Sequence, residues 1–168
     1  MSSFLIDIAT IKKLGFVNKN VDDPIISVTL RRVQDTVIKP ILSTTFYNRL
    51  IEGVYNDDLN ADEINLLNTY ITPCIVAAVD YRIINALTYE TRSKTVGTAR
   101  DEHINPVTIE EKHIREEDLK RDFEVYRKEL IGYLCDNSEL FPEYENYSTD
   151  DGGIAPDKGR TRTRVRFR

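Results

Sequence analysis

Apolar residues recur at spacings of three and four along most of this chain, which is the pattern of amphipathic α-helices that share a core. The first long segment opens at Asp22-Asp23-Pro24, a combination typical of a helix start. Its apolar stripe consists of Ile26, Leu30, Val33, Val37 and Ile41. Pro40 is expected to break or kink this helix, and a short helical turn closed by Gly15 precedes it. The pattern predicts a mainly α fold.

Two further helices follow. The second is expected to begin at Ser43 or Thr44, and the third at Asn60, where Glu63 completes a capping box. Pro73 is expected to kink the third helix or to open a new one. The inward residues of the second helix are predicted to be Phe46, Tyr47, Leu50, Ile51 and Val54. Those of the third are Leu67, Tyr70, Ile71, Cys74, Ala78 and the run from Ile84 to Leu87, and this segment has the strongest burial pattern.

Residues 91–107 interrupt the helical pattern. The segment is polar, rich in threonine and centred on Gly97, which favours a β-hairpin or an extended loop. Its 17 residues exceed the ~2–8 that usually join the helices of a bundle. Such an insertion is expected to contact a partner rather than the core.

The longest predicted helix runs from Thr108 to about Asn137 and approaches 45 Å at ~1.5 Å per residue. Its apolar stripe consists of Ile109, Leu119, Phe123, Tyr126, Leu130 and Leu134. The turns between the first two members of the stripe are nearly all charged, so they are expected to project from the core as a solvated face or a subunit contact. The predicted ion pairs at i,i+4 spacing are Glu111–Arg115, Glu116–Lys120 and Glu117–Arg121.

Residues 160–168 carry an arginine at every second position and no acid. Alternation with period two is the pattern of an extended strand, which would place all five guanidinium groups on one face. The other face would carry Thr161, Thr163, Val165 and Phe167. The formal net charge of the chain is -5, and without Lys158 and the five arginines residues 1–157 carry -11. A basic arm on an acidic body is either a solvated tail or, as we expect, an arm that docks on something outside its own fold.

These features predict a helical bundle with a long hairpin-like insertion and an extended C-terminal arm. We divide the 168 residues into a helical domain, 1–143, that contains the insertion 91–107, and a basic arm, 144–168. The candidate partner-binding residues are Arg160, Arg162, Arg164, Val165, Arg166, Phe167 and Arg168 in the arm, and Arg92, Lys94, Val96 and Arg100 in the insertion.

Composition and local patterns indicate a protein made and folded in a cytoplasm. The N-terminus lacks the basic region of a secretion signal. No apolar stretch approaches the ~18 residues of a membrane span. Cys74 and Cys135 lie far apart at apolar helical positions, which favours small buried hydrophobes in a reducing compartment over a disulfide framework.

No combination of residues predicts catalysis, a cofactor or a metal site. His103 lies in the polar insertion. Glu110-x-x-His113 has the spacing of half a di-iron site, but the chain contains no second Glu-x-x-His. Asp80 and Arg82, inside the apolar third helix, are expected to form a locally satisfied polar pair. A glycine-rich phosphate loop and a nucleophile elbow are also missing from the sequence, so we expect a protein that is not an enzyme.

Several segments resemble a known family. Residues 30–35 together with residues 38–50 are similar to the N-terminal helices of head–tail connector proteins from tailed phages infecting Bacteroidetes, including the crAss-like phages. Those relatives tend to carry a glycine where this chain has Ser43. Residues 87–112 and the ending Tyr133-Leu134-Cys135-Asp136-Asn137 with Phe141-Pro142-Glu143-Tyr144 are also similar. The resemblance spans roughly residues 5–145 and leaves out the arginine arm.

The resemblance implies a structural virion protein of the neck, assembled in the host bacterial cytoplasm. Such adaptors form a homo-oligomeric ring, typically twelvefold, beneath the portal protein. They contact the portal and further neck or tail proteins, and they surround a channel through which DNA passes without specific binding. The insertion and the arm would reach the portal or neighbouring subunits, and the alternation in the arm suits the addition of a strand to an exposed sheet edge.

Two other functions remain open from the sequence. The first is a nucleic-acid-binding protein that uses its arginine-rich tail on phosphates, and the second is a cytoplasmic helical protein of regulatory or chaperone-like type that binds a partner. A free DNA-binding protein is expected to spread basic charge over its folded body, whereas residues 1–157 carry -11. The size of the assembly distinguishes a large ring, a monomer that binds DNA and a small oligomer.

Overall fold

The computed structural model describes residues 4–17, 19–91, 96–98 and 109–145. The mainly α fold predicted from the sequence is confirmed. Its helices are α1 (Ile8–Leu14), α2 (Asp23–Val33), α3 (Lys39–Leu42), α4 (Thr44–Asn56), α5 (Ala61–Leu66), α6 (Thr72–Thr88), α7 (Ile109–Asp136) and α8 (Pro142–Glu145). Two π-helical turns, Gln34–Ile38 and Leu67–Ile71, and a 3-10 turn, Ser138–Leu140, lie between them. The strands β1 (Tyr89–Thr91) and β2 (Val96–Thr98) pair in antiparallel fashion, as expected of a hairpin.

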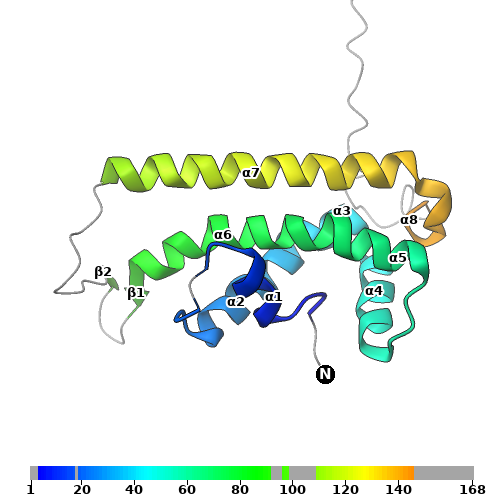
Figure 1. Cartoon of the computed structure of the whole chain (residues 1–168), viewed down its shortest axis with the longest axis horizontal. Coiled ribbons are helices and arrows are strands. Elements are labelled where there is room, and N and C mark those ends of the chain that lie inside the picture. The colour runs from blue at the N-terminus through cyan, green and yellow to red at the C-terminus, as the bar shows by residue number, and fades with distance from the viewer. Residues whose placement is uncertain (1–3, 18, 92–95, 99–108, 146–168) are drawn as a thin grey trace, which may run out of the picture.

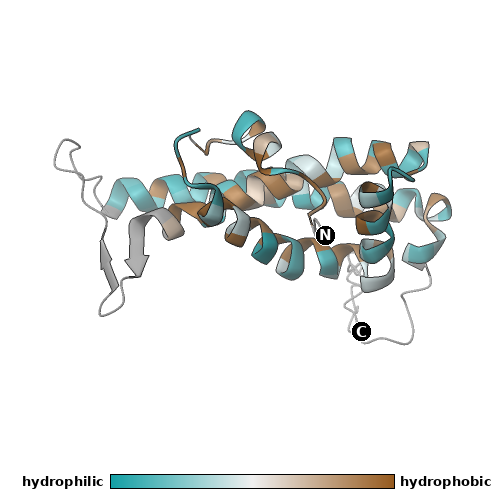
Figure 2. Ribbon diagram, turned by 90° about the horizontal axis from the view of Figure 1, so that it is seen from below, coloured by the Kyte–Doolittle hydropathy of each residue, from teal (hydrophilic) through white to brown (hydrophobic). Residues whose placement is uncertain are grey.

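Helix α6 is the central layer of the molecule (Figure 1). The long helix α7 packs along one side of it and runs in the opposite direction, while α2 and the short α1 cover the other side. Helices α4, α5 and α8 gather at one end, and the β1–β2 hairpin lies at the other. Because α6 is covered on both sides, every residue from Ile75 to Val79 is buried, as its apolar sequence predicts. In Figure 2 hydrophilic and hydrophobic stretches alternate along the helices, which is the expected pattern of amphipathic elements.

Each interior proline follows a widened helical turn. The residue before Pro40, Lys39, donates its N–H to the carbonyl of Gln34, five positions back. The residue before Pro73, Thr72, donates in the same way to Leu67. A π-turn of this kind accommodates a residue that has no N–H and whose ring would clash with a regular turn. Of the break or kink expected at Pro40, the break does not occur: the irregularity is a π-turn, and the helical path continues to Leu42.

A cluster of aromatic rings closes the end of the bundle near α8. Phe141 is buried and lies 5.3 Å, between ring centroids, from Phe46 of α4. Tyr133 of α7 stacks on Tyr70 at 4.0 Å, and its ring lies 6.3 Å from Phe141. These contacts hold the segment after α7 against the body, so the helical fold extends through α8 to Glu145.

The turn between α3 and α4 contains a strained residue. Ser43 has φ 78° and ψ 157°, a region that only glycine adopts without strain. Its side-chain oxygen accepts a hydrogen bond from the N–H of Phe46 at 3.2 Å and thereby caps α4. The backbone conformation thus favours glycine at this position, and the serine compensates partly through its cap.

Replacing Ser43 with glycine is expected to raise the free energy of unfolding by about 1 kcal/mol. Relief of strain is worth about 1–3 kcal/mol, whereas loss of the cap to glycine removes only a few tenths, and the added freedom of the unfolded chain offsets part of the gain. Ser43→Ala is the matched control, because alanine loses the cap and keeps the strain; it should lower stability by about 1 kcal/mol. Urea unfolding measures the change in the free energy of unfolding for each variant. A glycine variant less stable than the alanine variant would show that the backbone at position 43 is not strained.

Three expectations about burial are wrong. Val54 is exposed, because the last turn of α4 extends past the bundle and it is the preceding Gly53 that faces Leu59. Ala86 is exposed in the last turn of α6, where that helix continues beyond α2 toward the hairpin. Tyr126 of α7 is 40% exposed, because it borders a groove that no described side chain fills. The remaining described members of the α7 stripe, Leu119, Phe123, Leu130 and Leu134, are buried as predicted.

Candidate functional site

The partner-binding residues predicted from the sequence lie almost entirely outside the described residues. This holds for Arg92, Lys94 and Arg100 in the insertion and for Arg160, Arg162, Arg164, Val165, Arg166, Phe167 and Arg168 in the arm. Val96 begins β2, where its backbone pairs with Thr91. The contacts expected of these residues therefore stay predictions, and the described body offers a different candidate.

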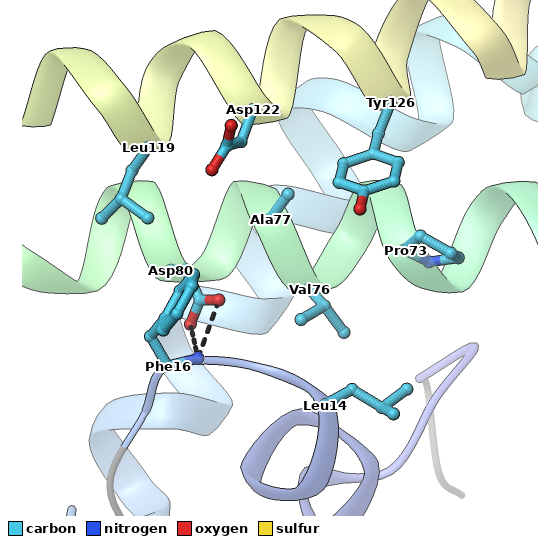
Figure 3. Close-up of a pocket in the computed structure, with 9 residues that line it drawn as sticks. All are labelled: Leu14, Phe16, Pro73, Val76, Ala77, Asp80, Leu119, Asp122 and Tyr126. Atoms are coloured by element: carbon cyan, nitrogen blue, oxygen red, sulfur yellow. Dashed lines mark hydrogen bonds between the residues drawn. The ribbon is translucent and has the colours of Figure 1, made fainter.

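A groove of about 350 Å³ lies between α1, α6 and α7 (Figure 3). Its lining is mostly apolar, with two carboxylates. The lining residues are Leu14, Phe16, Pro73, Val76, Ala77, Asp80, Leu119, Asp122 and Tyr126. Buried side chains of α6 form the floor, while α7 and the segment that follows α1 form the two walls. A site of this size lies at the lower end of the range for small ligands and is large enough for one or two side chains of a peptide.

Asp80 fixes the wall contributed by the segment after α1. Both of its carboxylate oxygens accept the backbone N–H of Phe16, at 3.1 and 3.0 Å (Figure 3). Glycine at position 15 permits this approach, because a Cβ there would lie 2.8 Å from an Asp80 oxygen and 2.9 Å from the Ile11 carbonyl. Burial raises the pKa of Asp80 above its ordinary value, although the Phe16 hydrogen bond and the charge of Arg115 act in the opposite direction.

Asp80 and Arg82 do not form the polar pair expected from the sequence. Residues two apart on a helix point to different faces, and here each binds another element. Asp80 binds the segment after α1, while Nη1 of Arg82 donates to the hydroxyl of Thr36 at 2.7 Å. These two side chains therefore attach α6 to two separate parts of the fold.

Lys12 holds the far end of the same segment. Its ammonium group donates to the carbonyls of Lys19 and Val21 at 3.0 and 2.8 Å, and it pairs with Asp23 at 2.7 Å. With Asp80 on one side and Lys12 on the other, the chain between α1 and α2 is attached at two points. This attachment positions Phe16 at the mouth of the groove.

Phe16 is 70% exposed although it is a large apolar residue. The guanidinium carbon of Arg115, on α7, lies 4.7 Å from the centroid of its ring, which is cation–π geometry. This contact links the two walls of the groove at one end. It also shows that an arginine and an aromatic ring are compatible partners in this part of the surface.

Asp122 is the exposed carboxylate of the groove. Its neighbours on α7 are paired: Asp118 lies 3.5 Å from Arg121, and Glu124 lies 3.2 Å from Arg127. Among the described residues, Asp122 forms no hydrogen bond and no ion pair. The sequence gives the reason, because none of the positions three or four residues away on the helix carries a cation.

Two of the three ion pairs predicted for the first turns of α7, Glu116–Lys120 and Glu117–Arg121, are replaced by others. Glu116 lies 3.6 Å from Lys112 rather than beside Lys120, and Arg121 pairs with Asp118 rather than with Glu117. The nitrogens of His113, a largely exposed side chain, lie 3.9 Å from Glu116 and 3.7 Å from Glu117. Within the described ranges, no three His, Cys, Asp or Glu side chains are grouped so that they could hold a metal ion.

The groove was not predicted from the sequence. The signals that could have indicated it are an aromatic residue directly after a helix-ending glycine, Gly15-Phe16, and a carboxylate, Asp80, inside an otherwise apolar helix. Neither signal identifies its partner, because the residues that meet here come from three elements far apart in the chain.

Comparison with known proteins places the chain in one family. A family model matches residues 38–152, which is more than half of the chain, and its description is a family of unknown function, DUF6712. The chain therefore belongs to that family. No curated protein and no solved structure gives a significant match. Among the described helices, none combines the length and the apolar composition that a membrane span requires.

Proposed function

We propose that this member of the DUF6712 family is a structural virion protein, a subunit of the ring that connects the head of a tailed phage to its tail and surrounds the DNA channel. The resemblance of residues 30–35, 38–50, 87–112, 133–137 and 141–144 to head–tail connector proteins supports this assignment. The partners in this proposal are further copies of the chain, the portal protein and other neck or tail proteins. In this role the protein carries out no catalysis.

The observation that carries the proposal is the exposed length of α7. This helix has 28 residues, and its described buried side chains occupy only one face. On its exposed surface lie two large aliphatic residues, Ile114 at 61% and Val125 at 50% exposure, and the half-exposed Tyr126. Ile114 and Val125 are eleven residues apart, about three helical turns, so they lie on the same side of the helix. In a closed ring, the flank of each subunit would be covered by its neighbour.

The charge of the body agrees with a channel that DNA passes through. Residues 1–157 carry a formal net charge of -11. Affinity for duplex DNA depends on lysine and arginine that neutralise phosphates, so an acidic lining would leave DNA free to slide. The basic charge of the arm would then serve contacts with protein partners.

The mass of the native assembly tests the proposal. We expect about twelve copies of the 19.4 kDa chain in one ring, formed by the purified protein alone or after addition of the portal protein of the same phage. Native mass spectrometry with and without the portal measures this. A monomer under both conditions would contradict the ring. A monomer that binds duplex DNA at physiological salt only when residues 158–168 are present would favour the nucleic-acid alternative, and a small stable oligomer would favour the helical partner-binding protein.

A further inference from the structure

We propose that the groove between α1, α6 and α7 binds the arginine-rich arm, residues 160–168, of the same chain. The inference does not depend on the ring, because it concerns one molecule. It rests on three properties of the described residues: an unpaired carboxylate beside an exposed aromatic ring, an apolar floor, and the distance between the groove and Glu145.

The first property is the chemistry of the wall formed by α7. Asp122 and Tyr126 are four residues apart and therefore lie next to each other on one side of the helix. Together they offer an arginine both a carboxylate and the face of an aromatic ring, two groups that guanidinium binds well. At the other end of the groove Arg115 already lies over Phe16 in this manner. The groove thus fits a second guanidinium, and its free carboxylate requires a cation rather than an anion.

The second property is the floor. Val76 and Ala77 of α6 are buried, as is Leu119 at the foot of the α7 wall, and the exposed side chains of Leu14 and Tyr126 extend the apolar surface outward. A volume of about 350 Å³ accepts an aromatic or branched side chain, but not a long run of them. The ligand should therefore combine arginine with single apolar residues. The sequence Arg164-Val165-Arg166-Phe167-Arg168 has that composition.

An extended arm can bind the groove with its arginines and with its apolar residues at the same time. Successive side chains of a strand point to opposite sides, so Val165 and Phe167 would face the floor together. The arginines would face outward, and their long flexible stems would let a guanidinium bend over the rim to Asp122. The net charge of the body, -11 without residues 158–168, favours the approach of this segment as a whole.

The third property is the distance between Glu145, where the described chain ends, and the groove. Helix α8 ends at Glu145 beside the C-terminal end of α7, and Asp122 lies 14 residues back along that helix from Asp136. At ~1.5 Å per residue this separation is about 21 Å. Fourteen residues, 146–159, connect Glu145 to Arg160, and a chain of that length can cover up to about 46 Å, so the separation is within reach. The arm of the same chain is therefore held near the groove at an effective concentration of order mM, which favours it over the arm of another copy.

The test uses the full-length protein with one substitution, Phe167→Trp. The chain contains no other tryptophan, so fluorescence reports on this position alone. We expect emission that is shifted to the blue and protected from acrylamide, relative to a free peptide of residues 158–168 with the same substitution. Adding Asp122→Arg should abolish both the shift and the protection. Rising salt should weaken them, because the interaction of the arm with the rim is electrostatic.

The matched control is Glu52→Arg, which reverses an exposed carboxylate on α4, away from the groove, and should leave the fluorescence unchanged. Thermal melting confirms that each variant is folded, which we expect because both substituted residues are exposed. Emission equal to that of the free peptide would overturn the proposal, and so would an Asp122→Arg variant that keeps the shift. A shift that disappears on dilution would show that the arm of a second copy is the occupant and would overturn binding within one chain.

Discussion

Replacing Phe123 with alanine is expected to lower the free energy of unfolding by about 3–5 kcal/mol. The side chain is only 9% exposed, belongs to the core between α6 and α7, and stacks on Tyr81 with 6.4 Å between ring centroids. Truncation removes that contact and leaves a cavity between two helices that cannot collapse freely. Urea unfolding followed by circular dichroism measures the change.

Tyr126→Ala is the matched control, three residues further along the same helix. Tyr126 is 40% exposed and borders the groove, so its truncation should change stability by less than ~1 kcal/mol. The sequence alone places both residues in one apolar stripe. If both variants lost about the same free energy, the groove would be closed in solution and Tyr126 would belong to the core.

Replacing residues 91–106 with a short Gly/Ser linker is expected to abolish ring assembly or docking to the portal and to leave the monomer folded. The described part of this insertion, the end of β1 and all of β2, lies at one end of the molecule, beyond the C-terminal end of α6. Removal should therefore have little effect on the melting temperature, while a contact surface would be lost. Native mass and thermal melting of the same preparation measure the two outcomes.

A second variant distinguishes the charges of the insertion from its backbone. Substituting serine for Arg92, Lys94 and Arg100 keeps the length of the segment and leaves Val96 in place. If this variant also fails to assemble, the three cations make the contact. If it assembles normally, the contact is made by the backbone and the remaining side chains of the insertion. A linker variant that assembled normally would show that residues 91–106 have some other role.

If the arm occupies its own groove, a partner must compete with that groove for the same residues. The sequence predicts that the arm docks outside its own fold, and both states use Val165, Phe167 and the arginines. A subunit that carries its arm on its own body would present less exposed apolar surface at Leu14 and Tyr126 before assembly. Binding to a partner would then release the groove, and the fluorescence of the Phe167→Trp protein would follow that exchange.

The local elements of this protein were predictable because their signals are local. Asn60 and Glu63 form both halves of the predicted capping box, with hydrogen bonds of 2.8 Å in each direction. Asp22 and Pro24 mark the start of α2. Each of these signals depends on groups within a few residues of one another, so no knowledge of the rest of the chain was needed.

The arrangement of the helices was decided only by tertiary contacts. Periodicity shows that one face of α7 is apolar, but which members of the stripe become buried depends on the helix that packs opposite, so Phe123 is covered and Tyr126 is not. Pro40 predicts a break or a kink, but only the structure shows that a π-turn, which begins six residues earlier, accommodates the residue without an N–H. The partner of Asp80 lies 64 residues away in the chain, at Phe16. A single sequence does not show which residues so far apart in the chain come into contact. For that reason the helices could be predicted from the sequence, whereas the groove is seen only in the fold.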